Sequence, residues 1–176
     1  MLIRNLQATD EDELRAFFEQ IPDDDRTFFK EDLEEPDVLR RWIDNQRGVR
    51  LVACDDDGWP SAIAAVWPGV GRSRHVGDLQ LVVAMEHRHR GLGRDMARHA
   101  LIEALRRGMW KLSVEVVSVQ QGTIDMFLSL GFAPEAMLRD QLRGADGEAQ
   151  DVVILSHFAD EAAQDLVLAA PEERKK

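Results

Sequence analysis

The sequence of 176 residues contains no tyrosine and only one cysteine, Cys54. A single cysteine excludes an intrachain disulfide and a zinc site built from several cysteines. No apolar run approaches the roughly 20 residues that a membrane-spanning helix needs, and the segment after Met1 has no apolar region typical of a signal peptide. The sequence therefore predicts a cytoplasmic protein with no membrane partner, in which Cys54 is a small buried residue of an apolar strand.

Basic residues are in the minority, since 22 Lys and Arg stand against 33 Asp and Glu and give a formal net charge of −11. Nucleic-acid binding needs a basic face that neutralises phosphates, so the composition predicts no nucleic-acid partner. The negative charge is compatible with a cationic partner such as an amine. The simpler interpretation is that the charge keeps the protein soluble.

Hydrophobic periodicity predicts a single domain over residues 1–158 and a C-terminal tail over 159–176, with a short helix before a frayed end. Strands alternate with helices in the middle of the chain and a hairpin closes the domain, a pattern that indicates an α/β fold with a mixed sheet. The predicted strands are 2–6, 49–55, 61–67, 76–85, 111–118, 135–142 and 150–157. The predicted helices begin after Thr9 as a cap, near Pro36, at Leu92 and after Ser118.

A basic turn with two glycines, Arg88-His89-Arg90-Gly91-Leu92-Gly93-Arg94, lies between an apolar strand and an amphipathic helix. Glycines let the backbone approach a ligand closely, and the N–H groups at a helix start attract anions. The three arginines add charged, forked donors in an otherwise acidic chain. A dinucleotide-binding turn needs a third glycine where Met96 stands, and a Walker loop needs Gly-Lys-Ser/Thr. The turn therefore indicates another kind of phosphate site, with an ordinary strand–helix turn and solvated arginines as the alternative.

Four of the five histidines fall between His75 and His99. This clustering raises the alternative of a metal site. However, His87 and His89 lie beside arginines, which repel cations. The sequence therefore predicts no metal and favours phosphate-side or surface roles for these histidines.

The turn and the strand before it, from Val83 to Gly93, resemble the acyl-CoA diphosphate loop of the GNAT N-acetyltransferase superfamily. That family's pattern is Gln/Arg-x-x-Gly-x-Gly/Ala at the start of its central helix. Two later segments resemble the family in the expected order: Leu112-x-Val114-Glu115-Val116 with Gln120 and Phe127-x-x-x-Gly131-Phe132, and a closing hairpin from Asp140-Gln141-Leu142-Arg143 to Asp151-Val152-Val153-Ile154-Leu155. The resemblance covers residues 2–158 and implies a central, mostly antiparallel sheet of about seven strands flanked by helices.

The resemblance also implies how acetyl-CoA is held as co-substrate. The backbone of residues 81–83 would pair with the pantetheine arm as an added strand would. A bulge in this strand, usual in the family, would leave an N–H for the thioester oxyanion. The implied cofactor-binding residues are Leu81, Val82, Val83, Arg88, His89, Arg90, Gly91, Leu92, Gly93, Arg94, Gln120 and Phe127.

The chain departs from the family at two positions, where Gln120 replaces the usual Asn and Phe127 the usual Tyr. That Tyr commonly protonates the departing thiolate, and no tyrosine is present here to do so. A thiol has a pKa of about 8.5, so a thiolate is a tolerable leaving group near neutral pH. The sequence thus predicts either a reduced need for a general acid or a different donor, with Ser129, Ser118 and water left open. Phe127 is then an apolar packing residue.

Acetyl transfer also needs a base, because an alkylammonium with a pKa of about 10.4 stays protonated at neutral pH. Glu115 is the first candidate, since it faces away from the apolar residues of its strand and aligns with a catalytic Glu of family members that acetylate protein N-termini. Asp78, on the neighbouring strand, is the second. The alternative for both is a solvated carboxylate on a strand.

The resemblance implies an N-acetyltransferase that moves acetyl from acetyl-CoA to a primary amine by direct attack. Phe28, Phe29 and Trp42, near the acidic residues 23–25, are candidates for the acceptor side, with helix packing as the alternative. The acceptor stays open between a small amine, a polyamine and a protein lysine. Acyl preference and oligomeric state, a homodimer included, stay open as well. The alternative function is a non-catalytic acyl-CoA-binding regulatory module.

Overall fold

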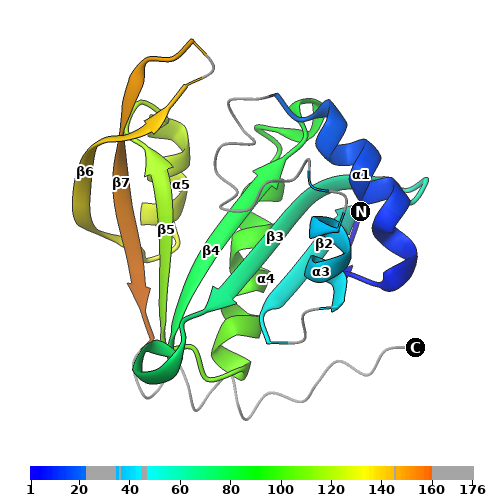
Figure 1. Ribbon diagram of the computed structural model, residues 1–176, viewed down its shortest axis with the longest axis horizontal. Coiled ribbons are helices and arrows are strands. Elements are labelled where there is room, and N and C mark those ends of the chain that lie inside the picture. Colours follow the sequence, from blue (N-terminus) through cyan, green and yellow to red (C-terminus); the bar gives the residue numbers. More distant parts are fainter. Residues whose placement is uncertain (23–34, 36, 45–46, 145, 160–176) are drawn as a thin grey trace.

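Seven strands form one sheet in the computed structural model, which describes residues 1–22, 35, 37–44, 47–144 and 146–159 (Figure 1). Their bounds are β1 Leu2–Asn5, β2 Val49–Cys54, β3 Pro60–Pro68, β4 Val76–Val83, β5 Lys111–Val117, β6 Ala133–Arg143 and β7 Ala149–Phe158. The strand order is β1-β2-β3-β4-β5-β7-β6, and each neighbouring pair is antiparallel except β4 and β5. The predicted mixed, mostly antiparallel sheet of seven strands is therefore confirmed.

Helices flank this sheet, and those described are α1 Glu11–Gln20, α3 Val38–Asp44, α4 Leu92–Arg106 and α5 Gln121–Ser129. The expectation that Thr9 caps the first helix is wrong, because Thr9 lies in a short 3-10 helix and Asp10 directly precedes α1. Arg4 holds this junction, since its Nη1 donates a hydrogen bond to the Asp10 carboxylate at 2.6 Å. None of the described helices has both the length and the hydropathy to span a membrane.

The residues expected on the acceptor side are only partly described. Phe28, Phe29 and the acidic residues 23–25 lie outside the described ranges, as do the helix start at Pro36 and the tail from residue 160 onward. Trp42 is described: it is buried in α3 and packs edge-on against Phe18 and Trp67, at 6.1 and 5.7 Å between ring centroids. Helix packing is therefore the role that the structure supports for Trp42.

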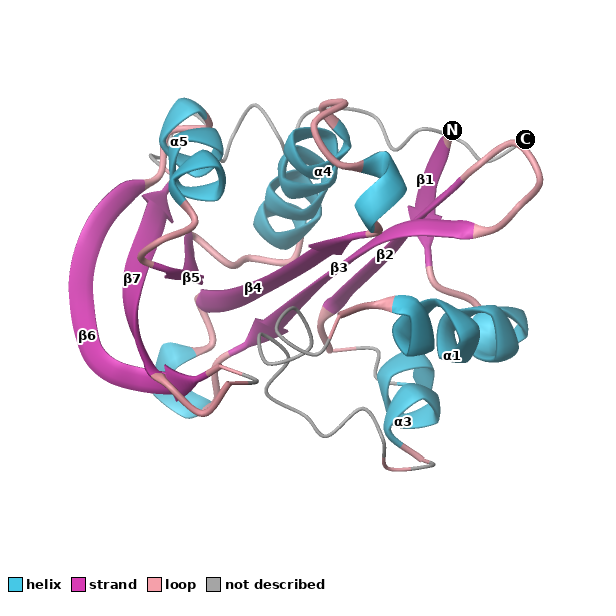
Figure 2. Cartoon of the chain, turned by 90° about the horizontal axis from the view of Figure 1, so that it is seen from above, coloured by secondary structure: helices cyan, strands magenta, loops and turns pink. Residues whose placement is uncertain are grey.

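The helices form one layer on each face of the sheet (Figure 2). α4 and α5 share a buried cluster with Leu79 of β4 and Val114 of β5. α1 and α3 share a second cluster on the opposite face, to which β4 contributes Val82. Because successive side chains of a strand point to opposite faces, Gln80 and Glu115 point to the α1–α3 face.

Cys54 ends β2 with 5% of its surface exposed. Burial raises the pKa of its thiol, so the thiol stays neutral and weakly nucleophilic near pH 7. The prediction that Cys54 is a small buried residue is confirmed.

Candidate active site

β4 and β5 separate along their length, and this separation opens the site (Figure 1). They pair in parallel from Val76↔Lys111 to Leu79↔Val114 and no further. β4 continues to Val83 and β5 to Val117, so the ends of the two strands are not paired with each other. Backbone groups that a regular sheet would pair therefore face the gap between the two strands.

Alternation along β4 decides which backbone groups face this gap. The N–H of Ala84 donates to the carbonyl of Ser61 at 3.0 Å, in line with the pairing of β3 and β4. Every second residue of an antiparallel strand bonds to the same neighbour. The backbone groups of Val82 therefore face β3, whereas those of Leu81 and Val83 face the gap.

The expectation of a bulge in β4 is wrong. β3 and β4 pair without a register shift from Ala62↔Val83 to Pro68↔Gly77. The shifts among the described pairs lie in β2–β3 and β6–β7 instead. The divergence of β4 from β5, rather than a bulge, leaves the N–H groups that face the gap unpaired with β5.

The turn between β4 and α4 contains two residues in the left-handed backbone region. His89 has φ 59° and Gly91 has φ 86°. Glycine reaches this region without steric cost, whereas a residue such as His89 stays there only when its surroundings hold it. α4 begins at Leu92, directly after Gly91, so its first N–H groups and the positive end of its dipole lie at the turn.

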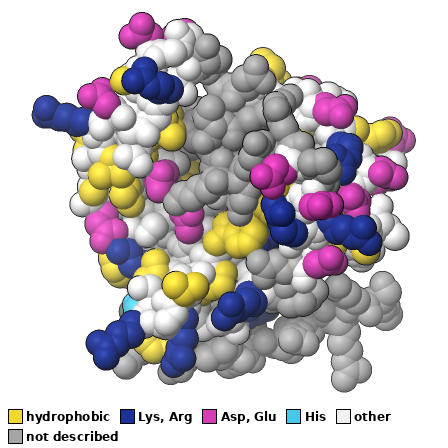
Figure 3. Space-filling view, viewed as in Figure 1, with side chains coloured by type: hydrophobic (Ala, Val, Ile, Leu, Met, Phe, Trp, Pro, Cys, Tyr) yellow, Lys and Arg dark blue, Asp and Glu magenta, His cyan; other side chains and the backbone are white. Residues whose placement is uncertain are grey.

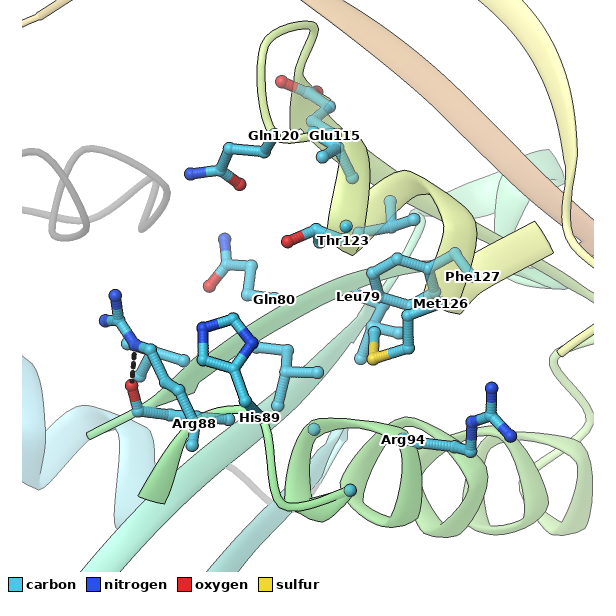
Figure 4. Close-up of a pocket in the computed structure, with 18 of the residues that line it drawn as sticks. Leu79, Gln80, Arg88, His89, Arg94, Glu115, Gln120, Thr123, Met126 and Phe127 are labelled. Atoms are coloured by element: carbon cyan, nitrogen blue, oxygen red, sulfur yellow. Dashed lines mark hydrogen bonds between the residues drawn. The ribbon is translucent and has the colours of Figure 1, made fainter. Parts of the chain in front are cut away.

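Two arginines of the turn are held by hydrogen bonds. Arg88 Nε donates to the carbonyl of Val83 at 2.9 Å and so ties the turn to the end of β4 (Figure 4). Arg94 Nη2 donates to Ser129 Oγ at 2.8 Å and so ties α4 to α5. Ser129 supports Arg94 at the surface, and neither Ser129 nor Ser118 is among the residues that line the cavity described next.

A cavity of about 760 Å³ lies between β4, β5, the turn and the start of α5. Its volume lies within the range of about 300–1,000 Å³ that is typical of small-molecule sites. Its lining includes most of the site residues predicted from the sequence: Asp78, Leu81, Val82, Val83, Arg88, His89, Gly91, Gly93, Arg94, Glu115, Gln120 and Phe127. The fold thus brings together residues from three separate segments of the chain.

Two predicted residues lie outside the cavity. Arg90 is exposed, and Leu92 packs its side chain into the core with 6% of its surface exposed. Phe127 lines the cavity but is only 1% exposed, and it packs edge-on against Phe132 at 5.1 Å between ring centroids. Its side chain is therefore mainly part of the core.

The two candidate bases lie on the same face of the sheet. Leu79 and Val114 pair in register, and both point into the α4–α5 cluster. Their neighbours Asp78 and Glu115 therefore point to the opposite face. Both carboxylates are half-buried and line the cavity, so a molecule that enters from this face meets both of them.

The cavity is also lined by residues that the sequence analysis does not predict as site residues: Leu79, Gln80, Val114, Val116, Gly122, Thr123, Met126 and Leu142. Thr123 lies one helical turn before Phe127, a spacing that could have placed both on the same side of α5. Figure 4 shows the Thr123 hydroxyl and the Gln80 side chain directed into the same space. Leu142 reaches the cavity from β6, where the register shifts between Leu138 and Leu142.

A second, basic cavity of about 810 Å³ lies at the other end of β4, lined by Gly71, Arg72, Arg74, His75, Arg107, Gly108 and Trp110. Figure 3 shows Lys and Arg side chains along the lower edge of the molecule in that view. The length of β4 separates this cavity from the turn at residues 88–94. In the part of the chain that the structure describes, no group of three His, Cys, Asp or Glu side chains could hold a metal ion.

The sequence matches the model of the acetyltransferase (GNAT) family over residues 11–132, well over half of the chain. No curated protein sequence matches the chain. Similar solved structures include an acetyltransferase of the GNAT family from Streptococcus pneumoniae, with 22% identity, a TM-score of 0.75, and coverage of 89% of this chain and 98% of that chain.

The names of two further similar structures state the acceptor of the enzyme. The ribosomal-protein-alanine N-acetyltransferase from Brucella melitensis has 22% identity and a TM-score of 0.74, with coverage of 90% of this chain and 99% of that chain. A chimera of the Vibrio cholerae spermidine N-acetyltransferase SpeG and hSSAT has 17% identity and a TM-score of 0.73, with coverage of 97% and 100%. At these identities the likeness concerns the fold alone.

Proposed function

The chain belongs to the acetyltransferase (GNAT) family, and we propose that it moves the acetyl group of acetyl-CoA to a primary amine by direct attack. Family membership supports acetyl-CoA-dependent acetyltransferase activity. The amine acceptor and the role of each residue are the proposal. The observation that carries it is the cavity between the diverging ends of β4 and β5, which is lined both by the basic, glycine-containing turn at residues 88–94 and by two carboxylates.

The turn holds the diphosphate of acetyl-CoA in this proposal. Backbone N–H groups of residues 89–94 and the start of α4 supply donors, including those of Arg90 and Leu92, whose side chains lie outside the cavity. Arg88 and Arg94 add positive charge. Gln120 and Phe127 form the wall on the α5 side.

The pantetheine arm then runs along β4 in the gap, as an added strand would. Leu81 and Val83 supply the backbone groups, because those of Val82 face β3. The carbonyl of Val83 already accepts a hydrogen bond from Arg88, so Val83 contributes its N–H. The N–H of Leu81 lies farther from the turn and is the proposed donor to the thioester oxygen as negative charge develops on it.

Glu115 is the proposed base, with Asp78 as the second candidate. The amine nitrogen attacks the thioester carbonyl carbon, the carbon–sulfur bond breaks, and the amine proton passes to the carboxylate directly or through water. Both carboxylates lie on the face of the sheet opposite α4 and α5, so the acceptor approaches from that face. The CoA thiolate leaves towards the other face of the sheet, on which α4 and α5 lie.

Thr123 is the proposed hydrogen-bond donor to this thiolate, which then takes its proton from water, because the Thr123 hydroxyl points into the cavity from α5 (Figure 4). General acid catalysis contributes at least about 10²-fold to a rate. We expect Thr123→Val to lower kcat by less than this factor, since a thiolate leaves readily. Thr123→Ser, which keeps the hydroxyl, should retain most of the activity. Steady-state kinetics at saturating acetyl-CoA measures both variants. Equal losses in the two variants would assign Thr123 a packing role instead.

An acceptor screen tests the proposed function. Small amines, polyamines and lysine peptides are incubated with acetyl-CoA, and thiol release is followed against hydrolysis without amine. We expect at least one amine to exceed the hydrolysis rate. Background release with every amine, together with retained acetyl-CoA binding, would favour the non-catalytic acyl-CoA-binding module.

A further inference from the structure

One buried polar group lines the cavity without a protein partner. Gln80, on β4, is only 4% exposed, and its Oε1 accepts a hydrogen bond from Trp67 Nε1 at 3.3 Å. Its amide nitrogen, Nε2, has no hydrogen-bond partner among the residues that the structure describes. Buried donors in folded proteins are nearly always paired, because an unpaired one costs stability. A ligand in the cavity would supply the missing partner.

The neighbouring tryptophan determines which end of the Gln80 amide faces the cavity. The oxygen and nitrogen of a glutamine amide look alike, so the hydrogen-bond network must assign them. The indole N–H of Trp67 can only donate, so it must face the Gln80 carbonyl oxygen. The NH₂ group therefore lies on the side of the amide away from Trp67, and Figure 4 shows the Gln80 side chain directed into the cavity that it lines. An amide NH₂ group can only donate.

Trp67 is itself held in place, which keeps this orientation fixed. The guanidinium of Arg50 stacks on the Trp67 ring at 3.5 Å from its centroid, and Trp42 packs against the same ring. Arg50 is 5% exposed, and its Nη1 donates to the carbonyls of Val49 and Val66. A buried stack of this kind presets the Gln80 donor before any ligand binds.

Gln80 lies on the acceptor side of the site rather than on the cofactor side. Its neighbours Leu79 and Leu81 pack with the α4–α5 cluster, so the Gln80 side chain points to the opposite face, as Asp78 and Glu115 do. The diphosphate turn leads directly into α4, and the pantetheine arm follows the gap from there. Gln80 therefore meets the molecule that approaches the thioester from the other face.

We propose that Gln80 selects the acceptor by donating a hydrogen bond from Nε2 to an oxygen that the acceptor carries next to its amine. The proposal rests on the proposed transfer to an amine. Asp78 and Glu115 favour the ammonium, and Gln80 recognises a hydroxyl or carbonyl oxygen beside it. The substrate class is thus an amino alcohol or an amino-acid-like amine. An amine with only alkyl carbons at that position leaves the Gln80 donor unpaired and is discriminated against.

Matched amines test this selection through kcat/KM. Ethanolamine is compared with n-propylamine, and glycinamide with isobutylamine, because the members of each pair have the same number of non-hydrogen atoms and only the first carries an oxygen next to its amine. We expect the wild-type protein to prefer the oxygen-bearing member of each pair. Gln80→Glu keeps the acceptor for Trp67 but removes the donor, and Gln80→Met removes both. Either change should reduce the preference about tenfold or more, whereas Gln20→Glu, at the exposed end of α1, should leave it unchanged.

A binding measurement separates failure of this proposal from failure of the proposed function. The side-chain NH₂ signals of Gln80 in an NMR spectrum are identified by their loss in Gln80→Met, and each amine is added to the CoA-loaded protein. A shift of these signals with ethanolamine or glycinamide, and not with the alkyl amines, supports the proposal even if no amine releases thiol. Equal shifts for both members of a pair, no shift with any amine, or an equal loss of kcat/KM for both members in the variants would overturn it.

Discussion

Replacement of Glu115 by Gln should lower kcat by about 10²-fold or more, the usual scale of base catalysis. The change keeps the size of the side chain and removes its basicity. The affinity for acetyl-CoA should stay nearly intact, because Glu115 lies on the face of the sheet away from the diphosphate turn. Steady-state kinetics and calorimetry measure the two quantities separately.

A pH profile and a second carboxylate make this test specific. The rate of the Glu115→Gln protein should climb with pH and approach the wild-type rate where the amine deprotonates unaided. Glu135→Gln is the matched control, because Glu135 bonds to Lys111 and Ser156 and does not line the cavity. A wild-type kcat at neutral pH in Glu115→Gln would move the role of base to Asp78.

Replacement of Gly91 by Val should weaken acetyl-CoA binding about tenfold or more. Gly91 has φ 86°, and a residue with a side chain is less stable by about 1–2 kcal/mol in the left-handed region. A free-energy change of about 1.4 kcal/mol corresponds to a tenfold change in affinity. A backbone that relaxes this strain turns the N–H groups of the turn away from the diphosphate. Calorimetric titration with acetyl-CoA measures the loss.

Gly108 provides the control for this effect. It follows the other end of α4, has φ 78°, and a Cβ there meets no atom within 4 Å. Gly108→Val therefore introduces similar backbone strain in the same helix without touching the turn. Thermal unfolding should show comparable destabilisation in the two variants, whereas only Gly91→Val should lose affinity. A Gly91→Val protein that is folded and binds acetyl-CoA as the wild type does would exclude the turn as the diphosphate site.

The turn and the strand of the proposed cofactor side are predictable because their signals are local in the sequence. Glycines, arginines and a helix start stand together at residues 88–94, and the strand before them reads as apolar. The alternation of Leu112, Val114 and Val116 also predicts that Glu115 points away from the α4 cluster, and the structure confirms it. Such periodicity depends only on the geometry of a strand.

The proposed acceptor side is less predictable because its geometry depends on contacts between distant segments. The Gln80 donor is set by Trp67, which the chain reaches only through the pairing of β3 with β4. Leu142 enters the cavity through a register shift in β6. The bulge expected in β4 is replaced by the divergence of β4 from β5, which pairing registers reveal and a single strand's sequence does not.

A crystal structure of the protein with bound CoA tests the central claim most directly, because arginines line both the cavity beside the turn at residues 88–94 and the second cavity at the other end of β4. The account predicts the diphosphate at the N–H groups of residues 89–94, the pantetheine arm in the gap beside Leu81 and Val83, and the thiol facing the space that Glu115 lines. A diphosphate bound instead between Arg72, Arg74 and Arg107, with the gap between β4 and β5 empty, would contradict it.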